Sequence, residues 1–265
     1  MQYPQINPIA IQIGPIAIHW YGLAYLAGII TASLLLKNVF SKTISNKKGL
    51  YTDFIFNTFL SIIIGGRLGY VFLYDLKYFL FNPLKIMALW EGGMSFHGGL
   101  IGIAISAYIF AKQHQKKYLA LTDLIALGAP IGLFFGRIAN FINAELVGRP
   151  STVPWAMVFP NHGNIPRHPS QLYEALFEGL ILWIILYILS KKSLKTGTLS
   201  ALFLMLYSLI RFAIEFFRAP DPQIDLLWGN LTLGQYLCIP MAIISITIIV
   251  KNSKKGSHYF CSDKN

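Results

Sequence analysis

Long apolar runs separated by short polar segments dominate the chain from about residue 16 onward. A helix needs roughly 20 apolar residues to cross a hydrocarbon core about 30 Å thick. The pattern therefore predicts an all-α integral membrane protein with about seven transmembrane helices, folded as a single polytopic domain over residues 1–265. The predicted spans lie near 16–36, 52–73, 93–111, 121–141, 171–189, 198–217 and 231–250.

Composition agrees with a membrane protein. Charged residues make up 12% of the chain and hydrophobic residues 55%, and the mean hydropathy is +0.54. A soluble domain carries roughly 25% charged residues, so a chain this poor in charge could not cover a water-exposed surface. Cys238 and Cys261 show no metal-ligand spacing, and we interpret neither as a disulfide partner. The N-terminus lacks the basic start of a signal peptide, so we expect the first apolar run to be retained.

The distribution of basic residues predicts the orientation. Most of the 22 Lys and Arg residues fall in alternate connections between the apolar runs, hence on one side of the membrane. The positive-inside rule then places the N-terminus outside and the C-terminus in the cytoplasm. Residues 251–265 become a basic cytoplasmic tail, and 143–170 an ordered periplasmic loop or small cap. The net charge of +11 thus reflects topology and contact with the lipid bilayer, and no nucleic acid is expected as a partner.

Several ionisable side chains lie within the apolar runs, where they are costly and mark a candidate functional site. With the predicted span directions, all of them fall in the outer half of the bilayer. Tyr207, Arg211 and Glu215 recur on one helix face, and Arg218 continues that stripe. The other such residues are Tyr21, Arg67, His97, Arg137, Glu174 and Glu178.

Arginine predicts an anionic ligand, because guanidinium binds phosphate through two hydrogen bonds and stays charged when partly desolvated. A neutral imidazole at His97 could act as a general base near pH 7. Arg–Glu pairs that only fix helix packing remain an alternative for the same residues. Gly98 and Gly102 form a GxxxG pair suited to close helix packing. Asp53 and Asp123 each follow a Thr at a span start, and we interpret both as helix N-caps.

One motif stands where the fourth predicted span meets the outer surface. The run GRIANFINAELVG, residues 136–148, places a cation, two amides and a carboxylate there. It resembles the signature of the bacterial prolipoprotein diacylglyceryl transferases, and the resemblance spans about residues 15–250. Further blocks that resemble the family, in the expected order, are GGRLGY at 65–70, HGG at 97–99, HPSQLYE at 168–174 and RFAIEFFR at 211–218.

This resemblance implies transfer of a diacylglyceryl group from phosphatidylglycerol to the lipobox cysteine of an exported prolipoprotein. The implied location is the bacterial inner membrane, with the active site toward the periplasm. No metal or organic cofactor is demanded. His97, Arg137 and Arg211 would be catalytic, although the sequence leaves open whether His97 or an arginine-centred arrangement deprotonates the thiol. Residues that would bind or shape the lipid site are Tyr21, Arg67, Asn140, Asn143, Glu145, Gly148, Tyr207, Glu215 and Arg218.

Two other function classes use the same residues. A transporter or flippase for an anionic lipid could bind its cargo with these arginines, but no polar path leads into the inner half and no internal repeat is visible. An intramembrane hydrolase could pair Ser95 with His97. Residues two apart on a helix point in different directions, and no G-x-S-x-G elbow is present.

Overall fold

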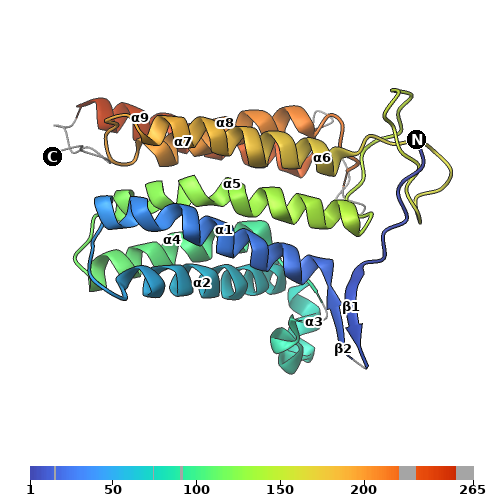
Figure 1. The fold of residues 1–265 in the computed structure, drawn as a ribbon, viewed down its shortest axis with the longest axis horizontal. Coiled ribbons are helices and arrows are strands. Elements are labelled where there is room, and N and C mark those ends of the chain that lie inside the picture. Colours follow the sequence, from blue (N-terminus) through green and yellow to red (C-terminus); the bar gives the residue numbers. More distant parts are fainter. Residues whose placement is uncertain (15, 74, 90–91, 221–230, 255–265) are drawn as a thin grey trace. The chain divides into compact units, whose positions relative to one another are not determined.

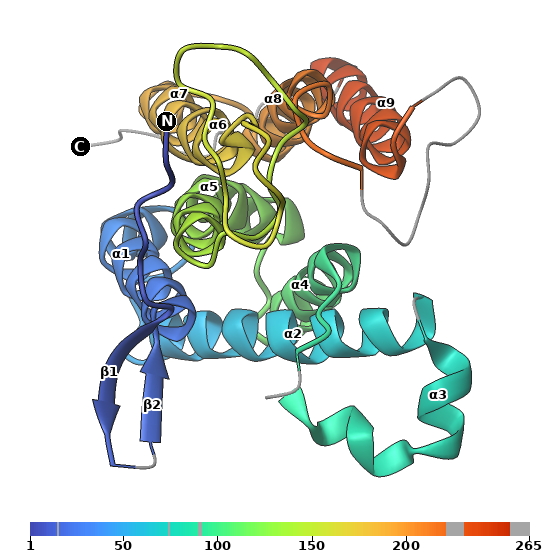
Figure 2. The ribbon, with the colours of Figure 1, turned by 90° about the vertical axis from the view of Figure 1, so that its right-hand side faces the viewer.

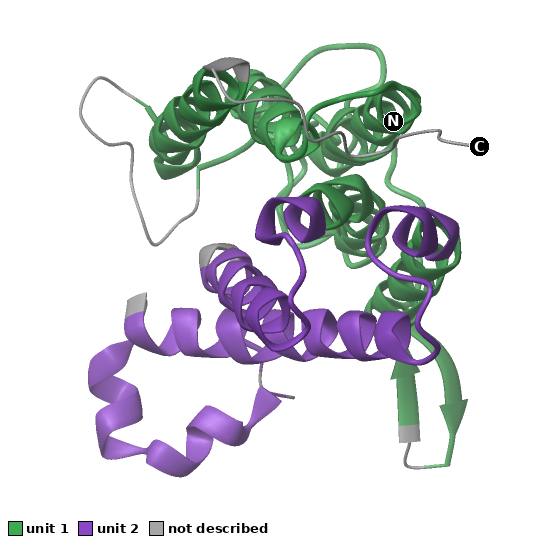
Figure 3. Cartoon of the chain, turned by 90° about the vertical axis from the view of Figure 1, so that its left-hand side faces the viewer, with its two compact units in different colours: residues 1–36, 123–265 green, residues 37–122 purple. Residues whose placement is uncertain are grey.

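The computed structural model describes residues 1–14, 16–73, 75–89, 92–220 and 231–254, and it is predominantly helical (Figure 1). The chain forms two compact units (Figure 3). Unit 1 contains residues 1–36 and 123–265, and unit 2 contains residues 37–122.

Five helices within the described residues are long and apolar enough to cross a membrane. They confirm the multi-pass membrane class, whereas the expected total of seven stays a prediction. Two further apolar helices, α4 (Phe96–Gln113) and α8 (Thr198–Ile214), contain shorter runs. The five candidate spans lie in α1 (Trp20–Thr43), α2 (Leu50–Leu73), α5 (Tyr118–Ile142), Ser170–Ser190 and α9 (Leu233–Lys254).

The first predicted span, near 16–36, began too early. Strands β1 (Ile9–Ile13) and β2 (Ile16–His19) form an antiparallel hairpin, and α1 starts only at Trp20. β-branched isoleucines alternate in this segment and favour extended backbone. Gly14 in the connection has a φ of +57°, which reverses the chain. The apolar run was therefore correctly located, but its first residues form a strand.

In unit 1, α5 packs against α1, where a Cβ added to Gly28 would lie 3.5 Å from Phe135 Cβ. The span Ser170–Ser190 changes its winding along its length. It starts as α6 (Ser170–Glu174), continues as a π-helical turn (Ala175–Ile181) and ends as α7 (Leu182–Ser190). π-turns inside helices are frequent at functional sites, and this one contains Glu178.

Asp123 caps a helix, although not the helix predicted from the sequence. It lies in α5, but its buried carboxylate accepts hydrogen bonds from Gly197 N at 2.6 Å and Ser200 N at 2.8 Å. These amides belong to the start of α8, with Gly197 as its N-cap residue. Amides at a helix start have no partner within the helix. The side chain therefore joins α5 to α8 from a distance in sequence that no local pattern reveals.

In unit 2, α2 and α4 lie alongside each other (Figure 2). The contact depends on the predicted glycines, because a Cβ added to Gly98 would lie 2.7 Å from Gly69 Cα, and one added to Gly102 would lie 3.1 Å from Gly65 Cα. The short helices α3 (Leu76–Phe81) and η1 (Pro83–Met87) follow α2 and were not predicted.

Residues 143–169, which we name the cap, form an irregular segment with isolated strand bridges. Its core is a small buried cluster of Tyr3, Val147 and Phe159. The predicted basic tail at 251–265 lies largely outside the described residues, which end with α9 at residue 254.

Candidate active site

Two arginines and two glutamates meet between α5, α8 and the Ser170–Ser190 span. Arg137 Nε lies 2.9 Å from Glu174 Oε2, and Arg137 Nη2 lies 3.5 Å from Glu178 Oε2. Arg211 Nη1 lies 2.9 Å from Glu174 Oε1 and 3.4 Å from Glu178 Oε1. Each glutamate therefore bridges both guanidinium groups, so three helical segments are joined by one set of ion pairs.

Two further charged groups complete what we name the ion-pair cluster. Glu215 pairs with Arg211 Nη2, one helical turn away. Arg218 Nη1 lies 3.7 Å from Glu174 Oε1 and 4.0 Å from Glu215 Oε1. The structure thus has the predicted row of polar residues on one face of the sixth span as far as Glu215. Because α8 ends at Ile214, Arg218 reaches the cluster from beyond the helix rather than from its face.

Thr232 was missed by the sequence argument. Its hydroxyl donates to Glu215 Oε2 at 2.9 Å, while Thr232 N donates to Gln235 Oε1 at 3.0 Å and Gln235 N donates to Thr232 Oγ1 at 3.2 Å. This reciprocal pattern is a capping box, whose T-x-x-Q signature is readable in the sequence. The start of α9 therefore fixes the orientation of the Glu215 carboxylate.

Charge in this cluster is balanced, three arginines facing three glutamates among the described residues. The Arg–Glu pairs that the sequence allowed as an alternative are therefore present in the structure. The three carboxylate side chains are 0–5% exposed, so each depends on guanidinium for the loss of hydration. Arg137 is the most exposed of the three cations, at 15%. Its Nε and Nη2 atoms are the ones that face the glutamates.

A second polar group lies at the end of α5, in a segment that we name the carboxamide turn (residues 140–145). Asn140 Nδ2 donates to Glu145 Oε1 at 2.9 Å, and Asn143 Nδ2 lies 3.5 Å from the same oxygen. The Tyr21 hydroxyl from α1 interacts with the Asn140 side chain. Ala144 has a φ of +54°, which turns the chain back so that Glu145 N reaches Asn140 O at 3.0 Å.

Gln171 connects the two polar groups. Its Nε2 donates to Glu145 O at 2.6 Å, and Glu174 follows it by three residues on α6. The structure thus joins four of the predicted site residues in one network of side-chain contacts. These residues are Tyr21, Asn140, Asn143 and Glu145. The short helix α6 therefore contacts both groups, the network through Gln171 and the ion-pair cluster through Glu174.

Gly148 lies where three backbone segments cross. Its amide donates to His168 O at 3.0 Å, and a Cβ at this position would lie 2.7 Å from Phe217 O. Any larger residue would push the cap away from the segment that carries Arg218. The geometry gives Gly148 a packing role next to the cluster, while its predicted contact with substrate stays a prediction.

A neutral hydrogen-bonded group links the cap to α6. Trp155 Nε1 donates to Tyr173 Oη at 2.6 Å, and Tyr173 Oη lies 3.1 Å from His168 Nδ1. Partial burial lowers the pKa of His168, so its imidazole is neutral near pH 7. Its Nδ1 can then accept a hydrogen bond from the Tyr173 hydroxyl.

Arg67 is bound differently from the cluster arginines. Its side chain is buried in unit 2, where the guanidinium donates only to main-chain carbonyls among the described partners, and it also lies 5.2 Å from the centroid of the Phe79 ring. Gly92 and Gly93 have φ values of +80° and +79°, which aim their carbonyls at this cation. The acceptors are Lys85 O (2.6 Å), Ile86 O (2.9 Å), Ala88 O (3.1 Å), Gly93 O (3.1 Å) and Gly92 O.

His97 and Tyr207 are placed by their helices. The His97 backbone is in the first turn of α4, which Ser95 caps by accepting a hydrogen bond from Gly98 N at 3.2 Å; the His97 side chain lies outside the described residues. Tyr207 is buried on α8 one turn before Arg211. Tyr207 therefore borders the ion-pair cluster, and the role of His97 as a base stays a prediction.

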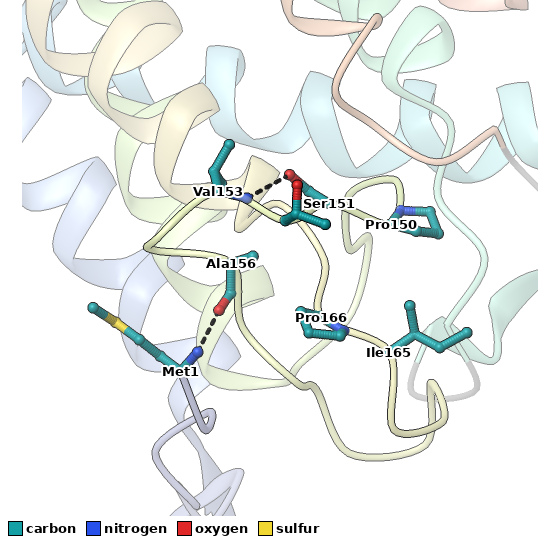
Figure 4. Close-up of a pocket in the computed structure, with 8 residues that line it drawn as sticks. Met1, Pro150, Ser151, Val153, Ala156, Ile165 and Pro166 are labelled. Atoms are coloured by element: carbon teal, nitrogen blue, oxygen red, sulfur yellow. Dashed lines mark hydrogen bonds between the residues drawn. The ribbon is translucent and has the colours of Figure 1, made fainter.

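An open hollow of about 590 Å³ lies between Met1 and the cap (Figure 4). The Met1 amino group donates to Ala156 O at 2.6 Å at its edge. None of the residues that the sequence predicted for the site lines it. The hollow is lined by Met1, Pro150, Ser151, Thr152, Val153, Ala156, Ile165 and Pro166.

The fold and the site define a multi-pass membrane protein with buried, carboxylate-bonded arginines beside a motif rich in carboxamides. The family model for prolipoprotein diacylglyceryl transferases matches residues 8–251. A phosphatidylglycerol–prolipoprotein diacylglyceryl transferase from Pseudomonas paraeruginosa is 49% identical over 252 residues, 94% of this chain and 95% of that protein. Proteins of the same name from Pseudomonas aeruginosa and Pseudomonas putida are each 48% identical, again over 94% of this chain and 95% of their own. The chain belongs to the prolipoprotein diacylglyceryl transferase family, and it is a bacterial multi-pass membrane protein.

Proposed function

We propose that this protein transfers the diacylglyceryl group of phosphatidylglycerol to the lipobox cysteine of exported prolipoproteins. The reaction forms a thioether, releases glycerol phosphate and begins lipoprotein maturation. The observation that carries this proposal is the family match over residues 8–251, supported by relatives of that activity that are nearly half identical over almost the full chain. The protein is accordingly a transferase.

The chemistry requires a nucleophile and a stabilised leaving group. The cysteine sulfur attacks the glycerol carbon that carries the phosphate, a C–S bond forms, and the C–O bond breaks with its electron pair leaving on the phosphate. The thiolate is the nucleophile, and a free thiol has a pKa near 8.5, so a base must take the proton. His97 is our candidate for that base.

The ion-pair cluster supports a role in binding the phosphodiester. Arg137 and Arg211 are held in place by Glu174 and Glu178, so their donors are oriented before substrate arrives. Oriented donors in a low-dielectric site stabilise developing charge without reorganisation. Arg137, as the more exposed cation, would meet the phosphate directly, and Arg211 would hold the glutamates behind it.

The remaining predicted site residues fall into groups with different proposed roles, according to the groups that surround them. We propose that the carboxamide turn, with Tyr21, orients the glycerol headgroup, because amides and a carboxylate can bind its hydroxyl groups. Tyr207, Glu215, Arg218 and Gly148 would shape the site from α8 and the cap. Arg67, predicted from the sequence to shape or support the site, holds the loop that leads into α4.

We also propose the finer topology. The shorter helices α4 and α8 would cross the bilayer with the five longer candidates, giving seven spans in one polytopic domain. The N-terminus and the cap would face the periplasm, and the C-terminal tail the cytoplasm of the inner membrane. This orientation fits a reaction that acts on exported proteins.

The direct test incubates the purified protein in detergent with phosphatidylglycerol and a lipobox peptide, followed by mass spectrometry of the peptide. We expect a mass increase of one diacylglyceryl group, absent when the peptide cysteine is blocked. His97→Ala should abolish most of this product if the imidazole is the base. An unmodified peptide from folded protein, together with lipid movement across vesicle bilayers, would instead favour a lipid transporter.

A further inference from the structure

Tyr3 is tied to the cap by its backbone. Tyr3 N donates to Val158 O at 3.2 Å, and Val158 N donates to Met1 O at 2.9 Å. This pairing is a short parallel bridge between the segment around Gln2 and the cap. It aims the Tyr3 side chain into the protein, where only 6% of the residue remains exposed.

The Tyr3 hydroxyl reaches the end of α5. It lies 2.8 Å from both Phe141 O and Ile142 O, the carbonyls of the last two residues of that helix. The last carbonyls of a helix have no partner within the helix and need a donor from elsewhere. Burial raises the pKa of Tyr3, so the hydroxyl keeps its proton and remains a donor.

The Tyr3 ring holds the same region by packing. Its centroid lies 5.3 Å from the centroids of Phe141 and of Phe159. Tyr3, Val147 and Phe159 form the buried cluster in the cap, with Phe141 and Ala144 packed against it. Phe141 and Val147 flank the reversal of the chain at Ala144, so ring and hydroxyl together support both sides of the carboxamide turn.

We propose that Tyr3 is a positioning residue for the carboxamide turn. Its hydroxyl holds the carbonyls from which the turn departs, and so fixes the Asn140 and Asn143 amides around the Glu145 carboxylate. The consequence for catalysis rests on the proposed function, in which this turn orients the phosphatidylglycerol headgroup. Tyr3 touches no reacting atom, and it acts only through the turn.

Tyr3→Phe tests the hydroxyl, because it keeps the ring and its packing. We expect the KM for phosphatidylglycerol to rise about 2- to 10-fold, the range expected for loss of one net hydrogen bond. The KM for the lipobox peptide and kcat should stay within about twofold of wild type. In parallel, amide hydrogen exchange should accelerate in residues 143–147. Tyr187→Phe is the matched control, since it removes a hydroxyl near the other end of the Ser170–Ser190 span.

The two measurements separate the possible outcomes. Faster exchange in the turn with a selective rise in the lipid KM supports the proposal. Unchanged exchange overturns it, and so does a uniform loss of activity that Tyr187→Phe reproduces. Faster exchange with an unchanged lipid KM overturns the positioning role and leaves Tyr3 as a packing residue only. If wild-type protein formed no adduct at all, the proposed function would fail, and exchange alone would decide whether Tyr3 holds the turn.

Discussion

The arginines of the two units have the same side chain and opposite surroundings. Arg67 in unit 2 is bound by main-chain carbonyls from residues 85–93. Arg137 and Arg211 in unit 1 are bound by carboxylates. A carbonyl compensates a buried cation only through its dipole, whereas a carboxylate cancels its charge. Burial and residue type alone therefore do not distinguish an arginine that holds a loop from one suited to bind a substrate anion.

The difference also concerns what each guanidinium can still do. Several carbonyls converge on Arg67, which occupies donors on Nε, Nη1 and Nη2. Arg137 uses Nε and Nη2 on the glutamates and is more exposed than its carboxylate partners. We therefore expect the two positions to respond differently to the same substitutions.

The largest effect is expected at Arg137. Arg137→Ala removes the cation that we propose meets the phosphodiester, and loss of one such donor typically costs about 10²- to 10³-fold in rate. The initial rate of peptide modification in detergent measures it. Lys192→Ala, at an exposed cation, is the control and should keep the wild-type rate. Arg137→Ala protein that is folded and within threefold of the wild-type rate would contradict the assignment.

Glu174→Gln should chiefly lower stability. The amide keeps the shape but removes the negative charge that bridges Arg137 and Arg211, and breaking a buried ion pair typically costs about 3–5 kcal/mol. The midpoint of thermal unfolding in detergent should fall accordingly. Asp53→Asn makes the same chemical change at an exposed position in the first turn of α2 and should leave the midpoint unchanged. Equal midpoints for both variants would mean that the ion pairs contribute little to the fold.

A smaller effect is expected from Arg67→Lys, which keeps the positive charge but replaces the planar guanidinium. A lysine ammonium has three donors at one point and cannot reach carbonyls spread along residues 85–93. Each buried carbonyl left unpaired costs about 1–3 kcal/mol. Hydrogen exchange should accelerate in that segment, whereas Arg137→Lys, which keeps a cation beside carboxylates, should leave it unchanged. If the amides of residues 85–93 exchanged as slowly in Arg67→Lys as in the wild type, the carbonyl contacts would not be what holds the loop.

Patterns that act over a few residues were predictable. The Arg211–Glu215 pair follows from a spacing of four on one helix, and the contact of Gly98 and Gly102 with α2 follows from their small size. Glu174 and Glu178 were recognised as ionisable residues within an apolar run, but their partners were not assigned. Thr232 could have been found from its capping box, since that signature is local.

Contacts between distant segments could not be read from spacing. Asp123 bonds to amides more than 70 residues away. Tyr3 reaches carbonyls of α5 that lie 138 and 139 residues further along the chain. A tyrosine near the start of a chain and an aspartate after a threonine carry no sign of such partners, because the partners are main-chain atoms that every residue possesses.

The amino-acid sequence by itself determined that this is a membrane protein, which residues are ionisable within its apolar runs, and which family it resembles. These properties depend on the length and hydrophobicity of local segments and on short motifs. Tertiary structure alone decided whether each buried arginine met carboxylates or carbonyls. Guanidinium donates hydrogen bonds to both kinds of oxygen, so its partner is set by which distant backbone or side chain the fold brings within about 3 Å.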